Sequence, residues 1–278
     1  MSEGFLLEMA DASRARVAAA RRTCADARLE ALVAALPAPP PRLQLSHAGF
    51  DVIAEVKLRS PAVGTLANDA GGLVERVAQY AGAGAAAVSV LTEPARFDGS
   101  LEHLQIAART LQQSGEVPAM RKDFLVDPYQ VLEARLAGAG GVLVILRMLE
   151  REDIESLLRA SARLSLFVLL EAFDEADIDL ATALIRRAPR GSQLLLGVNS
   201  RDLTTLKVVP GRLEELARQL PKDVPRVAES GVASAADAAR LSAAGYEVAL
   251  IGSALMTAPD PAALLRELIA AGRGAVRR

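Results

Sequence analysis

Short apolar runs alternate with helix-like segments over most of this chain. Eight runs of strand length lie between residues 50 and 253, with the sequences FDVIAEVK, AAAVSVLTE, VPAMRKDF, GVLVIL, LFVLLEAF, LLLGVNSRD, RVAESG and VALIGS. Apolar strands that alternate with helices form a parallel sheet that is covered on both faces. Eight such units predict an α/β fold, specifically a (β/α)8 TIM barrel, because an open sheet more often has five or six strands.

The segments between these runs carry the signals of helices. Several of them open on a capping residue or a proline, as at Asp127-Pro128, Ser234 and Asp260-Pro261. We expect helices over Leu73–Ala83, Leu101–Gln113, Pro128–Ala137, Arg151–Ala162, Glu175–Arg187, Leu213–Leu220, Ala235–Ala243 and Pro261–Ala271.

The first part of the chain has a different pattern. From about Gly4 to Leu36 it is rich in Ala, Leu, Arg and Glu, which favour helix. The run PAPPP, from Pro37 to Pro41, must end this helical segment, since proline removes a hydrogen-bond donor and fixes φ. We therefore expect residues 1–278 to form a single barrel domain in which residues 1–45 are a helical N-terminal extension and linker.

Composition narrows the class of protein. With 278 residues, 51% of them hydrophobic, the chain can bury a large core. The formal net charge of -2, without a basic block, favours neither nucleic acid nor a membrane surface as a partner. Cys24 is the only cysteine, which excludes an intrachain disulfide and fits a reducing compartment. We see no signal peptide and no apolar run near the roughly 18 residues that span a bilayer, so we expect a cytoplasmic protein.

Polar residues stand where the predicted strands end. A single charged residue after a strand is typical of a solvated loop, but seven of these strands end in charged or amide groups. A barrel brings its strand ends together at one mouth, where such folds carry their chemistry. Glu55 and Lys57 are two residues apart, so we expect them to point to the same side and form an ion pair. The strand-end residues are Glu55, Lys57, Glu93, Lys122, Arg147, Glu171, Asn199, Arg201, Glu229, Ser230, Gly252 and Ser253.

The inventory of reactive side chains points to lysines and glutamates. The chain has only two histidines, His47 and His103, and neither stands at a strand end. A Ser-His-Asp mechanism is therefore disfavoured, and no cluster has metal-ligand spacing, so we expect neither a metal nor an organic cofactor. Acid-base work would fall to Lys and Glu side chains whose pKa values are shifted by burial and by one another.

The last two predicted strands are followed by small residues. Ser230 and Gly231 follow the seventh, and Gly252 and Ser253 follow the eighth. Glycine is ordinary in a tight turn, but paired small residues with free backbone N–H groups at these two positions are typical of the phosphate site of a barrel. We expect a phosphorylated small molecule to bind there.

The motifs together resemble the indole-3-glycerol phosphate synthase family of tryptophan biosynthesis. They lie in the family's order from about Asp51 to Met256, as IAEVKLRSPAVG, VSVLTEPARFDGSLEHL, RKDFLVDPYQ, LLEAFDEAD, LGVNSRDLTTL, VAESGV and LIGSALM. The resemblance implies a TIM barrel that closes 1-(2-carboxyphenylamino)-1-deoxyribulose 5-phosphate to indole-3-glycerol phosphate with loss of CO2 and water.

The resemblance also implies roles for individual residues. Lys122 matches the general acid of ring closure, and Glu171 matches the acid-base partner in dehydration. Lys57, partnered by Glu55, matches the second catalytic lysine, which holds the substrate carboxylate. Three further residues match groups that orient the substrate, namely Asn199, Arg201 and Glu229. The phosphate-binding set is matched by Ser60, Ser230, Gly231, Gly252 and Ser253.

One departure concerns the loop after the first strand. The family usually has SPSKG where this chain has SPAVG, so Ala62 and Val63 replace a small polar residue and a lysine. The change leaves every residue assigned to the chemistry in place. Two other functions stay open at this point: a Schiff-base aldolase on a similar phosphate-binding barrel, and a barrel that binds without catalysis. A monomer is compatible with the sequence, as is association with other tryptophan-pathway enzymes.

Overall fold

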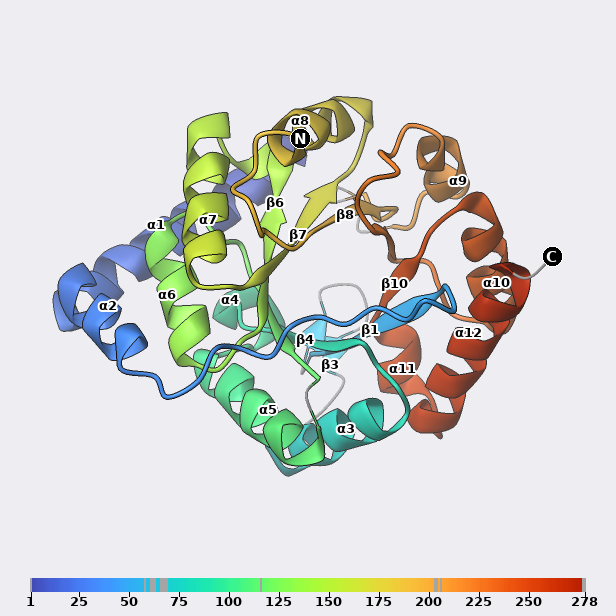
Figure 1. Cartoon of the computed structure of the whole chain (residues 1–278), viewed down its shortest axis with the longest axis horizontal. Helices are drawn as coiled ribbons and strands as arrows, with labels where there is room; N and C mark the ends of the chain where they lie inside the picture. Colours follow the sequence, from blue (N-terminus) through green and yellow to red (C-terminus); the bar gives the residue numbers. More distant parts are fainter. Residues whose placement is uncertain are drawn as a thin grey trace.

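Parallel strands close into a barrel at the centre of the molecule. The computed structural model describes residues 2–57, 59–60, 64–65, 70–115, 117–202, 205 and 207–276. Within these residues, eight strands follow one another around the barrel in the order β1-β10-β9-β8-β7-β6-β5-β4 (Figure 1). The predicted (β/α)8 barrel is therefore confirmed. Its strands are β1 (Asp51–Val56), β4 (Ala87–Leu91), β5 (Ala119–Lys122), β6 (Gly141–Ile145), β7 (Phe167–Ala172), β8 (Leu194–Asn199), β9 (Arg226–Glu229) and β10 (Val248–Ile251).

Helices surround the barrel as an outer ring (Figure 1). They begin where the sequence places caps: Asp127 and Ser234 each form a reciprocal capping box with the residue three positions on. The helices that follow the strands are α3 (Ala70–Gly82), α5 (Leu101–Ser114), α6 (Pro128–Leu136), α7 (Arg151–Arg163), α8 (Glu175–Ile185), α9 (Arg212–Ala217), α10 (Ala235–Ala244) and α12 (Pro261–Val276). Short elements that the apolar pattern did not predict are β2 (Arg59–Ser60), β3 (Gly64–Thr65), α4 (Pro94–Phe97), η1 (Leu146–Met148) and α11 (Ser253–Thr257).

The N-terminal extension is helical, as predicted, and contains two helices. They are α1 (Ser2–Thr23) and α2 (Asp26–Ala34), and α2 packs beside α6. The proline-rich linker then crosses one end of the barrel to reach β1 (Figure 1). Arg135 of α6 fixes this linker, because its guanidinium donates a hydrogen bond to the carbonyl of Ala38. No helix within the described residues is long and apolar enough to cross a membrane.

Alternation along the strands separates two cores. Side chains that point outward, such as Val52 and Val168, form a cluster with the surrounding helices. Side chains that point inward, such as Ile53, Met120 and Leu169, form a second cluster inside the barrel. Two residues further along each of these strands, the inward position carries a polar group, so a charged layer lies above an apolar one. The members of that layer on these three strands are Glu55, Lys122 and Glu171.

Candidate active site

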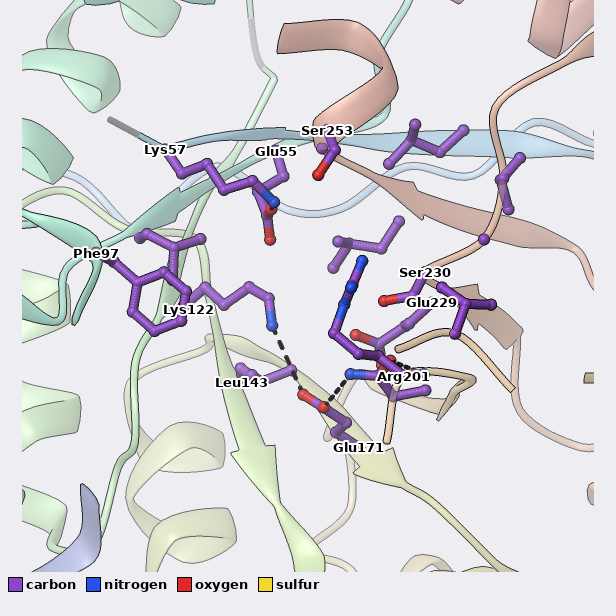
Figure 2. A pocket seen from close by; sticks show the side chains of 18 of the residues that line it. Glu55, Lys57, Phe97, Lys122, Leu143, Glu171, Arg201, Glu229, Ser230 and Ser253 are labelled. Carbon is purple, nitrogen blue, oxygen red and sulfur yellow. Dashed lines mark hydrogen bonds and ion pairs between the residues drawn. The ribbon is translucent and has the colours of Figure 1, made fainter. Parts of the chain in front are cut away.

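A cavity of about 440 Å³ opens at the carboxyl ends of the barrel strands. Every predicted site residue whose side chain the structure describes lines it. Ser60 belongs to β2, but its side chain is outside what the structure describes, as are Ala62 and Val63 altogether. Figure 2 shows the labelled side chains converging from different strands on one space. The charged and polar lining residues are Glu55, Lys57, Lys122, Asp123, Glu171, Asn199, Arg201, Glu229, Ser230, Ser253 and Thr257.

Glu55 and Lys57 form the ion pair that strand alternation predicts. The ammonium Nζ of Lys57 lies 2.5 Å from Oε1 of Glu55, and both side chains are largely buried. Burial alone would raise the pKa of Glu55, but the charges of Lys57 and then Lys122 outweigh it and lower that pKa. Gly252 makes room for the pair, since a Cβ at that position would collide with both side chains.

Lys122 and Glu171 face one another across the cavity (Figure 2). Nζ of Lys122 lies 3.7 Å from Oε2 of Glu171, an ion-pair distance that is too long for a hydrogen bond. Burial would lower the pKa of Lys122, but attraction to Glu171 and then to Glu55 raises it above its usual value. The ammonium is therefore charged and near a carboxylate, yet not tightly held by it. A substrate oxygen could therefore bind beside the ammonium of Lys122.

Asn199 orients the carboxylate of Glu171. Its Nδ2 donates a hydrogen bond of 2.7 Å to Oε1 of Glu171, and its Oδ1 accepts one of 2.9 Å from the backbone N–H of Arg201. These two bonds fix which end of the amide faces Glu171. One oxygen of Glu171 is thereby held, and the other points to Lys122.

Small residues build the side of the cavity at β9 and β10. Ser230 and Gly231 both have positive φ values, 66° and 76°, so the chain turns sharply as soon as β9 ends. Ser200 stabilises this turn, because its hydroxyl donates to the carbonyl oxygens of Glu229 and Ser230. Gly252 and Ser253 follow β10 and begin α11. The backbone of both turns borders the cavity.

Two strand-end residues turn away from the cavity, contrary to the expectation that all strand ends would meet there. Glu93 caps α4, where its carboxylate accepts hydrogen bonds from the N–H groups of Ala95 and Arg96. Arg147 lies in η1 and pairs with carboxylates of the next unit of the barrel. Both side chains therefore have local structural partners that alternation along a strand could not reveal.

The residues that follow Lys122 have separate roles. Asp123 accepts hydrogen bonds from the Thr92 hydroxyl and the Phe124 N–H, and it is almost fully buried. Asp123 therefore braces the loop after β5. Phe124, which we expected to point away from Lys122, lines the cavity as well. That expectation was wrong, because residues two positions apart along an extended chain point to the same side, as Glu55 and Lys57 do.

An aromatic wall was missed by the sequence reasoning. Phe5 of α1, Phe97 of α4 and Phe124 all line the cavity, although the chain has only six phenylalanines. The ring of Phe124 lies edge-on to Phe5 with centroids 5.9 Å apart, and 6.4 Å from Phe97. Phe97 and Phe124 stand shortly after the second and third barrel strands, which was the available signal. Nothing in the local sequence could indicate that α1 brings Phe5 to the same place.

Comparison with known proteins agrees with this geometry. Residues 6–268 match the sequence profile of a family described as "Indole-3-glycerol phosphate synthase". The chain belongs to the indole-3-glycerol phosphate synthase family. The family's reaction is a ring closure with decarboxylation in tryptophan biosynthesis, which makes the enzyme a carboxy-lyase with a small phosphorylated substrate.

Relatives of the chain carry the same description. An indole-3-glycerol phosphate synthase from Opitutus terrae is 38% identical over 266 residues, which cover 94% of this chain and 97% of that protein. A multifunctional tryptophan biosynthesis protein from Schizosaccharomyces pombe is 41% identical over 219 residues, but these cover 28% of it. The fold resembles 3-hexulose-6-phosphate synthase from Salmonella typhimurium, with a TM-score of 0.60 and 14% identity over 81% of this chain and 99% of that one. At that identity the likeness concerns the fold alone.

Proposed function

We propose that the indole-3-glycerol phosphate synthase reaction takes place in the cavity between Lys122 and Glu171, with these two residues as its acid and base. The observation that carries the assignment is their arrangement. An ammonium and a carboxylate face the same space 3.7 Å apart, at the mouth of the barrel. A site that only bound its ligand would not need an acid and a base together.

Ring closure is the first step. The aromatic carbon that bears the carboxylate attacks the ketone carbon, and the ketone oxygen gains negative charge as the bond forms. Lys122 meets that oxygen and transfers a proton from Nζ, so the oxygen becomes a hydroxyl group. A ketone is a weak electrophile, and a cationic acid at the developing alkoxide is therefore the chief catalytic need.

Decarboxylation and dehydration complete the reaction. The bond to the carboxylate breaks, CO2 leaves, and its bonding electrons restore the aromatic ring. The new hydroxyl then takes a proton from one of the two cavity lysines and leaves as water, while the carboxylate of Glu171 removes a proton from the neighbouring carbon. The double bond of the indole forms between these two carbons. Glu171 serves this proton transfer, and Asn199 holds its carboxylate in place through the 2.7 Å hydrogen bond.

The rest of the cavity matches the parts of the substrate. The wall of Phe5, Phe97 and Phe124 offers an apolar surface to the benzene ring. Lys57 holds the substrate carboxylate until CO2 leaves, and Glu55 keeps its ammonium in position. The orienting groups for the ribulose hydroxyls are Asn199, Arg201 and Glu229, and the phosphate group binds Ser60, Ser230, Gly231, Gly252 and Ser253.

One assay tests this function. Purified protein is mixed with 1-(2-carboxyphenylamino)-1-deoxyribulose 5-phosphate, and the fluorescence of the indole product is followed. We expect turnover without any added metal or cofactor. If no indole fluorescence appeared at micromolar enzyme, the proposal would be contradicted. The alternative of a barrel that binds without catalysis would then be favoured. Borohydride trapping with a triose phosphate distinguishes this function from the aldolase alternative. Only a Schiff-base enzyme would give a covalent adduct.

We also propose that residues 1–278 act as a single domain, as a monomer in the cytoplasm. Phe5 of the N-terminal extension lines the cavity together with residues of the barrel, which supports a single domain. Size-exclusion chromatography with light scattering would test the oligomeric state. A dimer at micromolar concentration would contradict the monomer.

A further inference from the structure

Glu229 differs from the other carboxylates of the cavity in having no polar partner. It ends β9, lines the cavity and is 1% exposed. Neither of its carboxylate oxygens has a hydrogen-bond partner within the described part of the chain. Glu55, in contrast, pairs with Lys57 at 2.5 Å, and Glu171 accepts a 2.7 Å hydrogen bond from Asn199. A buried ionised carboxylate without such partners would be costly.

The residues that face Glu229 explain why no partner reaches it. On one side its carboxyl group lies over Gly197, where a Cβ would collide with Oε1. On the other side β10 presents the apolar Leu250 opposite it in the strand register. The charged groups that surround it come from β1, β5, β7 and the residues after β8, namely Glu55, Lys122, Glu171 and Arg201.

The two lysines of the cavity serve other carboxylates. Lys57 is in contact with Glu55, and Lys122 lies at ion-pair distance from Glu171. Two carboxylates of the same mouth therefore already have counter-charges, and a third negative charge would face them in a buried space. Burial and then the charge of Glu171 raise the pKa of Glu229 well above its usual value, although Lys122 opposes the shift.

We propose that Glu229 is a neutral carboxylic acid in the free protein, and that its O–H donates a hydrogen bond to an oxygen atom of the substrate. The protonation state stands on the geometry of the free protein, whereas the choice of ligand rests on the proposed function. The proton stays on Glu229 throughout, so this residue binds and positions the substrate without transferring a proton.

A neutral Glu229 has a consequence for the adjacent turn. Ser230 and Gly231 follow it directly and border the space in which a phosphate group would bind. A carboxylate at that point would repel a phosphate dianion, whereas a carboxylic acid would not. Protonation of Glu229 thus allows an acidic side chain to lie beside an anion site.

Infrared spectroscopy of the free protein tests the protonation state. We compare the C=O stretching band of protonated carboxyl groups in the wild type and in Glu229→Gln at about pH 6.5, some two units above the pKa of an ordinary glutamate. We expect a band in the wild type that Glu229→Gln lacks. Glu55→Gln is the matched control, and it should keep the band because Glu55 is ionised beside Lys57. Absence of the band from the wild type, or its persistence in Glu229→Gln, would overturn the proposal.

The pH dependence of turnover tests the hydrogen bond to the substrate. The ratio of kcat/KM in the wild type to kcat/KM in Glu229→Gln should fall as pH rises, because only the wild type loses its donor by ionisation. A ratio that rises with pH would mean that Glu229 works as a carboxylate, which overturns the donor role. Because the infrared comparison uses no substrate, failure of the proposed function would leave its result intact.

Discussion

At the scale of single residues, Lys122 is the side chain on which the proposed chemistry depends most. Its charge survives burial because the carboxylates of Glu171 and Glu55 attract it, and its distance of 3.7 Å from Glu171 leaves space for a substrate oxygen. We predict that Lys122→Ala lowers kcat by about 10³-fold with the fold intact, the scale of losing a principal electrostatic group. Lys122→Arg should not restore the rate, since a guanidinium is a much weaker acid with a different shape.

Steady-state kinetics and circular dichroism measure this effect and control for folding. Lys222→Ala is a suitable companion variant, because Lys222 is exposed and does not line the cavity. It should turn over like the wild type. Near-normal turnover in Lys122→Ala would mean that Lys122 is an ordinary charged residue at a strand end and not the general acid.

Glu171 offers a second test at this scale. Glutamine has the same shape and keeps a hydrogen-bonding partner for Asn199, but it cannot exchange a proton near neutral pH. We predict that Glu171→Gln lowers kcat by about 10²-fold or more while substrate affinity changes by less than about tenfold. Single-turnover kinetics measures the effect on the rate of the reaction, and a separate binding measurement gives the effect on substrate affinity. A variant that loses affinity and keeps its rate would make Glu171 a positioning group.

At the scale of elements, the turns after β9 and β10 are predicted to hold an anion. Gly231 has a positive φ of 76°, and Gly252 sits where a Cβ would collide with Glu55 and Lys57. The positive φ of Gly231 favours glycine there, and the residues of both turns line the cavity. We predict that inorganic phosphate shifts the amide resonances of residues 230–231 and 252–253 in an NMR titration. Shifts confined to another part of the molecule would refute this site.

Arg16 connects helix α1 to the end of β5, where Lys122 lies. Arg16 donates a 2.7 Å hydrogen bond to Asp123, the buried neighbour of Lys122, and lies 3.6 Å from Glu93. Replacing Arg16 by an apolar residue removes one hydrogen-bond donor from the buried carboxylate of Asp123. We predict that Arg16→Met lowers the free energy of unfolding by about 1–3 kcal/mol.

Urea denaturation followed by circular dichroism measures this loss. Arg14→Met is the matched control, because Arg14 is on the same helix but pairs with Asp11 at the surface. It should change stability by less than about 0.5 kcal/mol. Equal effects of the two substitutions would show that the contact with Asp123 contributes nothing particular.

The sequence predicted these elements with uneven success. The eight barrel strands were visible because each contains a short apolar run, and the charged layer was visible because it stands at the ends of those runs. The side-chain directions of Glu93 and Arg147 were not predictable, since each is set by a local partner outside its strand. The division of the N-terminal segment into α1 and α2 also escaped notice, because no proline or glycine marks the break at Cys24.

At the scale of the whole molecule, the cavity combines distant parts of the chain. Phe5 and Leu250 line the same space although nearly the whole sequence separates them. Local pattern cannot report such contacts, because they depend on closure of the barrel and on where α1 packs. The polar half of the cavity was therefore predictable from strand ends, whereas its aromatic half required the tertiary structure.

The pH dependence of stability depends on the same buried mouth. Between the ordinary pKa of a glutamate and the raised pKa of Glu229, the folded protein holds a proton that the unfolded chain has released. The free energy of unfolding therefore decreases with rising pH in this window. We predict that Glu229→Gln becomes more stable relative to the wild type as pH rises from about 4.5 toward neutral, by up to about 1.4 kcal/mol per pH unit.

Glu55 should give the opposite sign, because its pKa is lowered in the folded protein by Lys57 and Lys122 against the effect of burial. Its contribution to stability is present above the ordinary pKa of a glutamate and is lost as pH falls through the lowered value. Glu55→Gln should therefore destabilise the protein more at pH 7 than at pH 3, in urea denaturation at both values. If Glu229→Gln followed the same trend as Glu55→Gln, Glu229 would be ionised in the folded protein, and the assignment of a single neutral acid beside the two ion pairs would be wrong.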